Sequence, residues 1–416
     1  MNSPKKVRVA FFTDILTKDL DGAIKTMYQL IDRIPEEEFE FLFFCGTPPN
    51  HTIKHRVVSV PTVTLFFNCT YKIAVPFLSG IKLTKELSDF NPDIIHISTP
   101  SFLGFFALNY ANKNQIPVLT IYHTHFISYL KYYLKLMPFL IKPAEFIAKK
   151  LYRTFYNKCS TIYTPTIQMV TELKEMGISG KLLKVWQRGI DTNLFNPSKK
   201  DTAFMKSITG NDKPCVLFAS RLVWEKNIET LFNIYDEAEA QQLDVNFIVT
   251  GVGVAEQVAQ QRMKKAIFLG FIDHSTLAKI FASSDIFLFP SISETYGNVV
   301  VEAMACGCTP VIARGGGSQS LVMDGKTGFL CEPTNAKEYI RKIDTVLQNS
   351  TLKEKMKMSG LQYTSTLKWQ TLANNYFEDI NCLALNYRYK KHLMPSYHDS
   401  VALQFKSKVL SYLLQK

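Results

Sequence analysis

The sequence lacks the features that identify membrane-spanning, secreted and cysteine-based proteins. None of its apolar runs is long enough to cross a bilayer as a helix, and its first residues lack the apolar core of a signal peptide. The cysteines show no metal or redox spacing, since Cys306 and Cys308 are separated by a single residue. We therefore expect a cytoplasmic protein from a reducing compartment, either soluble or peripheral on the inner face of a membrane.

Acidic residues are scarce compared with basic ones, and the formal net charge of the 416 residues is +12. The excess is concentrated in two segments, since residues 129–158 carry a net +6 and residues 383–416 a net +5. A local basic patch indicates an anionic partner surface. No nucleic-acid recognition motif accompanies this charge, so we expect a membrane rather than a nucleic acid as partner.

The first basic segment also contains eight aromatic residues. Basic side chains near helical spacing beside an aromatic face are typical of a helix that lies in a membrane interface. The spaced cations are Lys131, Lys135 and Lys142. Pro138 and Pro143 exclude one straight helix, and residues 401–413 form a second apolar stretch with lysines. The alternative is a core helix with solvated lysines and a tail that packs on the first half of the chain.

Strand and helix patterns alternate along the chain and restart near residue 200, which predicts two α/β domains with mostly parallel sheets. The strand patterns cover residues 7–12, 39–45, 92–97, 117–122, 214–219, 245–250, 266–269, 286–289, 309–312 and 328–331. We predict domains at residues 1–200 and 201–365. Residues 366–416 would supply a helix that crosses back to the first domain, followed by a basic amphipathic tail.

The most informative motif covers residues 289–303. A buried strand leads into a polar turn with Glu294, and Gly297 opens a helix that contains Glu302. Ligands bind at such strand ends in α/β sheets, and free N–H groups at a helix start suit an anion or a hydroxyl. Taken alone, either glutamate is better explained as an ordinary helix-start or surface acid. Residues 315–317 are three glycines after another strand, where the backbone could approach a ligand or simply form a turn.

Two cations follow the first strand of the second half. Arg221 and Lys226 lie just after residues 214–219. Two cations in the first strand-to-helix turn of a domain suit a diphosphate, and the alternative is a pair of solvated charges before a helix.

In combination these motifs resemble the donor half of the retaining glycosyltransferases of family four. The resemblance covers roughly residues 5–380 and is strongest at 214–332. Its motifs are Arg221 with Lys226, Gly251-Val252-Gly253, Leu269-Gly270-Phe271, and the glutamates Glu294 and Glu302 with seven residues between them. The resemblance implies the GT-B fold, in which two Rossmann-like domains face each other across a cleft.

The resemblance also implies roles for these residues. Glu302 would bind the donor ribose, and Glu294 would lie near the transferred sugar. Arg221 and Lys226 would hold the diphosphate and stabilise its departure, because fixed cations stabilise the charge that develops on a leaving group. The other implied donor contacts are Phe271 and Ile272, which would flank the base, and Tyr296, Gly297, Asn298 and Val299.

The first half matches the family more weakly. His123 follows a strand and is similar to the family histidine beside the donor sugar, so we favour it over His125; the alternative is a core or capping histidine. Gly22 matches the glycine loop that approaches the diphosphate, although Asp21 stands where the family usually has a second glycine. His96 ends a strand pattern and would at most line the cleft.

The resemblance implies a hexosyltransferase that retains the anomeric configuration, with a nucleotide diphosphate sugar as co-substrate and neither metal nor further cofactor. Residues 70–76, Asp21-Gly22 and residues 122–125 look most like the subgroup that glycosylates lipids, including diacylglycerol. A membrane lipid is therefore the expected acceptor. Three alternatives are open: a transferase for a soluble sugar or polysaccharide, a nucleotide-sugar epimerase of the same fold, and a non-enzymatic nucleic-acid binder.

Overall fold

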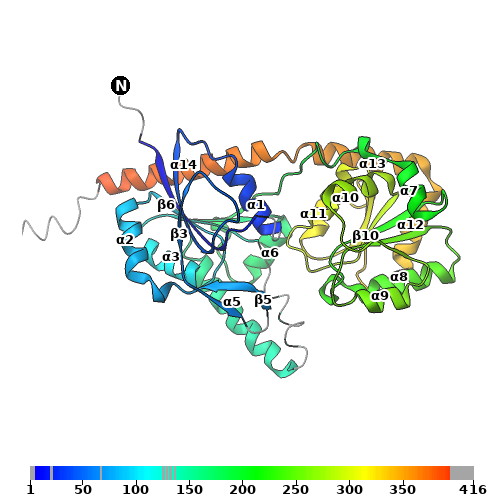
Figure 1. Cartoon of the computed structure of the whole chain (residues 1–416), viewed down its shortest axis with the longest axis horizontal. Helices are drawn as coiled ribbons and strands as arrows, with labels where there is room; N and C mark the ends of the chain where they lie inside the picture. The colour runs from blue at the N-terminus through cyan, green and yellow to red at the C-terminus, as the bar shows by residue number, and fades with distance from the viewer. Residues whose placement is uncertain are drawn as a thin grey trace, which may run out of the picture. The chain divides into compact units, whose positions relative to one another are not determined.

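The computed structural model describes residues 5–18, 22–65, 68–123, 127, 130, 134 and 137–393. These residues divide into two compact units, coloured along the chain in Figure 1. The first unit contains the described residues of Met1–Ile121, Lys158–Thr161 and Ala373–Lys416, and the second contains those of Tyr122–Asn157 and Ile162–Leu372.

The first sheet has the strand order β3-β2-β1-β6-β7-β8-β9. Its strands are β1 (Val7–Ile15), β2 (Phe39–Thr47), β3 (Arg56–Ser59), β6 (Ile94–Ile97), β7 (Val118–Ile121), β8 (Thr161–Thr164) and β9 (Leu183–Val185). The antiparallel hairpin β4 (Thr62–Leu65) and β5 (Asn68–Ala74) forms a separate small sheet. The helices up to residue 182 are α1 (Gly22–Ile31), η1 (Pro76–Leu78), α2 (Gly80–Phe90), α3 (Phe102–Lys113), η2 (Pro138–Leu140), α5 (Ile141–Tyr156), α6 (Ile167–Glu175) and η3 (Gly180–Leu182).

Aromatic side chains from the central strands form the core of the first unit. The rings of Phe12 and Phe44 stack with centroids 4.5 Å apart across the parallel pair β1–β2. His96, fully buried on β6, stacks on Phe11 at 4.1 Å. Its Nδ1 lies 2.8 Å from the hydroxyl of Tyr376. Burial lowers the pKa of His96 to about 3, so the expectation that His96 lines a cleft is wrong and this residue is a neutral part of the core.

The second sheet is parallel throughout and has the order β12-β11-β10-β13-β14-β15. Its strands are β10 (Cys215–Ala219), β11 (Asn246–Thr250), β12 (Ile267–Phe268), β13 (Ile286–Phe289), β14 (Thr309–Ala313) and β15 (Phe329–Cys331). The helices of the second half are η4 (Pro197–Lys199), α7 (Thr202–Thr209), η5 (Trp224–Lys226), α8 (Ile228–Ala240), α9 (Glu256–Arg262), α10 (His274–Ser283), α11 (Asn298–Ala305), η6 (Gly317–Leu321), α12 (Ala336–Gln348), α13 (Ser350–Ser365) and α14 (Trp369–Leu393).

From Ala373 onward, α14 belongs to the first unit, and Figure 1 shows it as one long helix. Phe377 packs on Phe39 with ring centroids 5.2 Å apart, and the guanidinium of Arg388 forms an ion pair of 2.6 Å with Asp93. The predicted fold class is confirmed: both sheets are Rossmann-like, and the C-terminal helix returns to the first unit.

The cysteines whose side chains the structure describes are free, and most of them are buried. The buried ones are Cys45, Cys159, Cys215, Cys306, Cys308 and Cys331, whereas Cys382 on α14 is exposed. Burial raises the pKa of the Cys45 thiol to about 12. Within the described ranges, no helix combines the length and the apolar character needed to cross a membrane.

Candidate functional site

The second sheet reverses its strand order between β10 and β13. From β10 the order continues through β11 to β12, and from β13 it continues through β14 to β15. In an open parallel sheet the loops separate at such a reversal and leave a ligand-binding crevice at the carboxyl ends of the strands. The two strongest sequence motifs follow these two strands, which places them at one edge of the second unit.

Lys226 and Glu294 come together at this edge. Lys226 is the last residue of η5, after β10, and its ammonium group forms an ion pair with a carboxylate oxygen of Glu294 in the turn after β13. The Lys226 side chain is 6% exposed and that of Glu294 is 22% exposed. A cation this well buried is held in place by its partner, since an unpaired buried charge is costly.

Arg221 lies in a more open environment than Lys226. Its side chain is 64% exposed, and its guanidinium lies 3.7 Å from the carboxylate of Glu225, which is four residues further along the chain. The structure therefore gives the two predicted cations different surroundings: Lys226 is fixed within the site, whereas Arg221 stands in solvent.

Gly297 connects the Glu294 turn to α11. Its φ is +98°, a conformation that side-chain-bearing residues rarely adopt, and a Cβ atom there would lie 2.9 Å from the Cβ atom of Ser318. Asn298 and Val299 begin α11 and are half-buried, and Glu302 lies one turn further on and is also half-buried. The first turn of a helix leaves N–H groups without helical acceptors, and these groups favour an anion.

The glycines after β14 permit close packing against the Glu294 turn itself. A Cβ atom on Gly317 would lie 1.9 Å from the carbonyl oxygen of Thr295, and one on Gly316 would lie 2.4 Å from that of Ile292. The N–H of Gly317 donates a hydrogen bond of 2.6 Å to the carbonyl of Glu294. These glycines therefore hold the turn that carries Glu294, a role that the sequence pattern did not identify.

Tyr296 is buried, and its hydroxyl donates a hydrogen bond of 3.0 Å to the backbone carbonyl of Arg188. The Arg188 guanidinium lies over the Tyr296 ring, 5.6 Å from its centroid, and its Nη1 is 3.4 Å from the side-chain oxygen of Asn298. Tyr296 thus anchors the turn to the connector that precedes residue 200.

His123 lies beside the same turn, within the second unit. Its side chain is buried, and its backbone carbonyl accepts a hydrogen bond of 2.8 Å from the hydroxyl of Thr295. Since Thr295 directly follows Glu294, this hydrogen bond joins the segment that carries His123 to the turn that carries Glu294. His125 lies outside the described residues.

Phe271 and Ile272 follow β12 and differ in exposure. Phe271 is 81% exposed, whereas Ile272 is half-buried and packs against the core of the second unit. Two glycines after β11 allow the neighbouring turns to pack closely, because a Cβ atom on Gly251 would lie 1.9 Å from the carbonyl oxygen of Ser220. The exposed ring of Phe271 leaves one apolar face available to a flat partner.

Gly22 belongs to the first unit, where it is the first residue of α1 and its carbonyl accepts a hydrogen bond of 2.8 Å from the Thr26 hydroxyl. It follows β1 and therefore lies at the carboxyl edge of the first sheet. Asp19, Leu20 and Asp21 lie outside the described residues.

Two residues of the site were not found from the sequence. Asn227 adopts a left-handed conformation with φ of +57°, and its side-chain amide donates to the carbonyls of Pro290 at 3.0 Å and Pro333 at 2.9 Å. It thereby joins the loops after β10, β13 and β15. Asn is enriched in this backbone conformation, but only the folded sheet reveals its bridging role. Arg188 was treated as part of a polar connector, and no local signal distinguishes it there.

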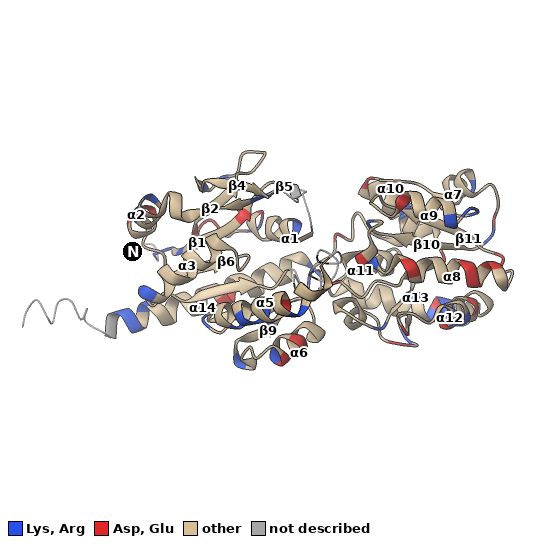
Figure 2. Ribbon diagram, turned by 90° about the horizontal axis from the view of Figure 1, so that it is seen from below, with Lys and Arg blue, Asp and Glu red and all other residues tan. Residues whose placement is uncertain are grey.

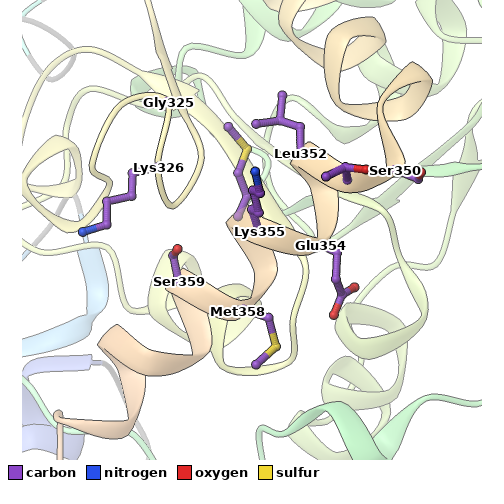
Figure 3. Close-up of a pocket in the computed structure, with 10 residues that line it drawn as sticks. Gly325, Lys326, Ser350, Leu352, Glu354, Lys355, Met358 and Ser359 are labelled. Atoms are coloured by element: carbon purple, nitrogen blue, oxygen red, sulfur yellow. The ribbon is translucent and has the colours of Figure 1, made fainter.

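A depression of about 810 Å³ lies elsewhere on the second unit, lined by the turn at Gly325 and Lys326 and by Ser350–Ser359 of α13, and Figure 3 shows these side chains. The turn precedes β15, so it lies at the amino edge of the parallel sheet, whereas Glu294 and Lys226 follow strands at the carboxyl edge. None of the predicted donor residues lines this depression.

The assembled edge can bind a group that combines negative charge with hydroxyls. Lys226 and Arg221 supply positive charge, the start of α11 supplies N–H groups, and the carboxylates of Glu294 and Glu302 can accept hydrogen bonds from hydroxyls. A sugar linked to a diphosphate has both kinds of group, and the arrangement favours charge that develops when the diphosphate leaves.

Comparison with known proteins agrees with this geometry. Residues 20–194 match the model described as "Glycosyltransferase Family 4", and residues 199–362 match the model "Glycosyl transferases group 1". Among solved structures, the sucrose-phosphate synthase of Thermosynechococcus elongatus superposes with a TM-score of 0.70 at 19% sequence identity and covers 91% of this chain and 99% of its own. This likeness concerns the fold.

Two curated relatives have informative names. The GDP-mannose-dependent alpha-mannosyltransferase of Corynebacterium glutamicum is 28% identical over 80% of this chain and 79% of its own length. The alpha-monoglucosyldiacylglycerol synthase of Streptococcus pneumoniae is 26% identical over 74% of this chain and 71% of its own. With matched family models over both halves and a GT-B architecture, the chain is a hexosyltransferase and belongs to the glycosyltransferases of family four.

Proposed function

We propose that this enzyme transfers a sugar from a nucleotide diphosphate sugar to the hydroxyl of a membrane lipid, with retention of the anomeric configuration. The observation that carries the donor side is the ion pair between buried Lys226 and Glu294 at the reversal of the second sheet. The acceptor side is supported by the relative whose name specifies diacylglycerol. A transferase for a soluble sugar would share every donor residue, so the acceptor requires its own test.

In this proposal the bond between the anomeric carbon and the diphosphate oxygen breaks, while the acceptor oxygen bonds to the same face of that carbon. A phosphate oxygen takes the acceptor proton, so a strong protein base is not required. Lys226 and Arg221 stabilise the charge left on the diphosphate. Glu302 holds the ribose, and Phe271 covers the base. His123 and Glu294 lie beside the transferred sugar. We expect activity to be unchanged in EDTA, and a loss that a divalent ion restores would contradict this.

A donor and acceptor panel tests the proposal. Purified enzyme would be incubated with each of several nucleotide sugars, with and without diacylglycerol vesicles, and release of nucleoside diphosphate would be measured. We expect one donor to release nucleoside diphosphate slowly by hydrolysis without lipid and faster by sugar transfer with lipid. NMR of the glycolipid should show the donor's anomeric configuration. An inverted product would refute retention, transfer only to soluble sugars would refute the lipid acceptor, and a second sugar formed without acceptor would indicate an epimerase.

We also propose that the enzyme binds anionic membranes through residues 129–158. Lys131, Lys135 and the tail 401–413 lie outside the described residues. In the described part, α5 carries Lys142, Lys149 and Arg153 along one side, and Figure 2 shows basic residues on this helix. Next to them are exposed apolar side chains, namely Phe139, Phe146, Ile147 and Leu151. Basic and apolar faces side by side favour an interfacial position.

Vesicle co-sedimentation tests this surface. The triple variant Lys142→Glu, Lys149→Glu and Arg153→Glu should release the protein from anionic vesicles, and salt should weaken wild-type binding. A matched control places the same charge change on exposed lysines outside residues 129–158, as Lys326→Glu, Lys337→Glu and Lys355→Glu. Equal loss of binding in both triple variants would indicate an effect of net charge alone, and recovery of the wild type in the supernatant would refute membrane binding.

A further inference from the structure

The carboxyl edge of the first sheet carries an apolar patch that the donor chemistry does not use. Four large side chains make up this patch: Phe77, Leu78, Ile81 and Phe102, which are 78%, 63%, 92% and 63% exposed. They come from η1, from the start of α2 and from the start of α3. η1 lies against both helices, so the segments that carry the four exposed side chains are neighbours.

The position of this apolar patch in the fold follows from the strands that precede it. α3 begins after the loop that leaves β6, and η1 follows β5, whose hairpin crosses the ends of β1 and β2. A Cβ atom on Gly46, at the end of β2, would lie 2.9 Å from the carbonyl oxygen of Asp14 and 3.0 Å from the Cβ atom of Ala74. The patch therefore lies at the edge where an open parallel sheet binds its ligands, and Gly22 follows β1 at the same edge.

A buried carboxylate holds together the two segments that present the patch. Asp14, near the end of β1, accepts a hydrogen bond of 3.2 Å from the N–H of Ala74, just before η1. It also accepts one of 2.9 Å from the hydroxyl of Thr99, three residues before Phe102. Burial raises the pKa of Asp14, although hydrogen bonds from Ser101, Thr99 and Ala74 oppose that shift. Two loops that are fixed to one buried side chain form a defined surface rather than a loose collection of exposed residues.

The surroundings of the patch carry charges of both signs, with lysines in excess. Lys82 and Lys85 lie on α2 with Ile81, Lys72 lies on β5, and all three are exposed; Figure 2 shows basic residues on α2. Two acids lie on the same helix: Glu86, which is ion-paired with Arg56, and Asp89, which is exposed. Lysines around exposed apolar side chains complement an anionic lipid surface, whereas a soluble sugar acceptor offers nothing that would cover four large apolar side chains.

We infer that this apolar patch receives the acyl chains of the acceptor lipid and makes the enzyme select acceptors by chain length. The inference rests on the proposed lipid acceptor and adds where that acceptor is recognised. The hydroxyl to be glycosylated would be presented at the carboxyl edge of the first sheet, while the acyl chains lie on Phe77, Leu78, Ile81 and Phe102. The contact is apolar, so it contributes to acceptor recognition and leaves the donor chemistry unchanged.

The experiment measures kcat/KM for diacylglycerols of increasing acyl length, at a fixed mole fraction in mixed micelles. We expect the wild type to prefer long chains over dihexanoylglycerol. In the variant Phe77→Ser with Phe102→Ser, the ratio of long-chain to short-chain kcat/KM should fall about tenfold, because each ring buries a large apolar area only against a long chain. Donor hydrolysis without acceptor should remain as in the wild type. The control is Leu385→Ser with Tyr389→Ser, two exposed residues of α14 in the same unit.

The outcomes separate this inference from the proposed function. If the wild type glycosylates no lipid, the proposed acceptor is wrong; if it glycosylates lipids and the Phe77/Phe102 variant keeps the chain-length ratio, the inference is wrong. If deletion of residues 394–416 causes the same loss of chain-length preference, that segment and not the lipid occupies the patch. If the wild type is a dimer and the Phe77/Phe102 variant is a monomer, a second copy of the chain covers the patch. Asp14→Ala should also lower the ratio, and thermal unfolding would show whether that variant folds.

Discussion

The carboxyl edges of the two sheets occupy equivalent positions in their folds, but one edge is charged and the other is apolar. At the edge of the second sheet, loops from several strands are bonded to one another and enclose a buried ion pair, Lys226 with Glu294. At the edge of the first sheet, two loops are bonded to the buried carboxylate of Asp14 and expose large apolar side chains. Under the proposed function, the charged edge would hold the donor and the apolar edge would receive the acyl chains of the acceptor.

The largest expected effect comes from breaking the charged edge. Lys226→Ala should lower kcat/KM by roughly a hundredfold or more, because it removes a fixed charge from the leaving diphosphate and leaves Glu294 without its partner. Glu294→Gln should mainly lower kcat, and Glu302→Ala should mainly raise the donor KM, since ribose contacts are equal in the ground and transition states. Steady-state kinetics with the preferred donor would measure these effects, and wild-type values in all three variants would refute the site.

The next largest effect should come from adding a methyl group to a glycine at each edge. Gly317→Ala puts a Cβ atom 1.9 Å from the carbonyl oxygen of Thr295, which should cost about 1–3 kcal/mol of folding free energy. The matched change at the first edge is Gly80→Ala, where a Cβ atom meets nothing within 4 Å, and Ala in a helix should leave stability unchanged or slightly raised. Urea unfolding would give both values, and equal effects would mean that the second edge is not more tightly packed.

Acid should destabilise the unit that carries the apolar patch through His96. Its pKa is about 3 in the folded protein and 6.5 in a model peptide, so below about pH 6.5 the unfolded chain binds a proton that the folded chain does not. Stability should therefore fall by up to about 1.4 kcal/mol for each pH unit below this value. Urea unfolding from pH 7 to 5 should show that the free energy of unfolding changes less with pH in His96→Phe than in the wild type. The control is His51→Gln, a change at an exposed histidine, which should keep the wild-type pH dependence.

The smallest expected effect concerns Phe271, whose ring is 81% exposed. Phe271→Ala should raise the donor KM by about two- to twelvefold with kcat unchanged, because stacking on a base adds about 0.5–1.5 kcal/mol and is present in both ground and transition states. An isothermal titration with the nucleoside diphosphate would detect the same loss. Unchanged affinity would show that the base lies elsewhere and that Phe271 is not part of the donor site.

The same contrast explains what the sequence could predict. The strands of the second sheet were predicted close to their observed limits, because buried parallel strands are short apolar runs that turn residues bound. The hairpin β4–β5 was missed, since it forms a separate sheet outside the main one and its Val63 is exposed rather than part of a buried apolar run. The E-x7-E spacing located the turn of Glu294, but Asn227 and Arg188 act through partners distant in sequence.

His96 shows the limit of judging a residue by its position on a strand. It follows the same pattern as His123, a histidine at the end of a predicted strand, yet its partner is Tyr376, 280 residues away. Only the return of α14 to the first unit converts a candidate ligand-binding side chain into a core residue. The apolar patch was likewise beyond sequence reasoning, because Phe77 and Phe102 are distant in the chain and an apolar residue is ordinarily expected in a core.

The distribution of thiols gives this enzyme a natural position for a probe. Buried thiols react slowly with maleimides because the reactive thiolate is scarce when burial raises the pKa, as it does for Cys45, Cys306 and Cys331. Cys382 is exposed on α14, so among the cysteines whose side chains the structure describes it should be labelled first. A fluorophore or spin label at this position would report on the C-terminal helix during turnover.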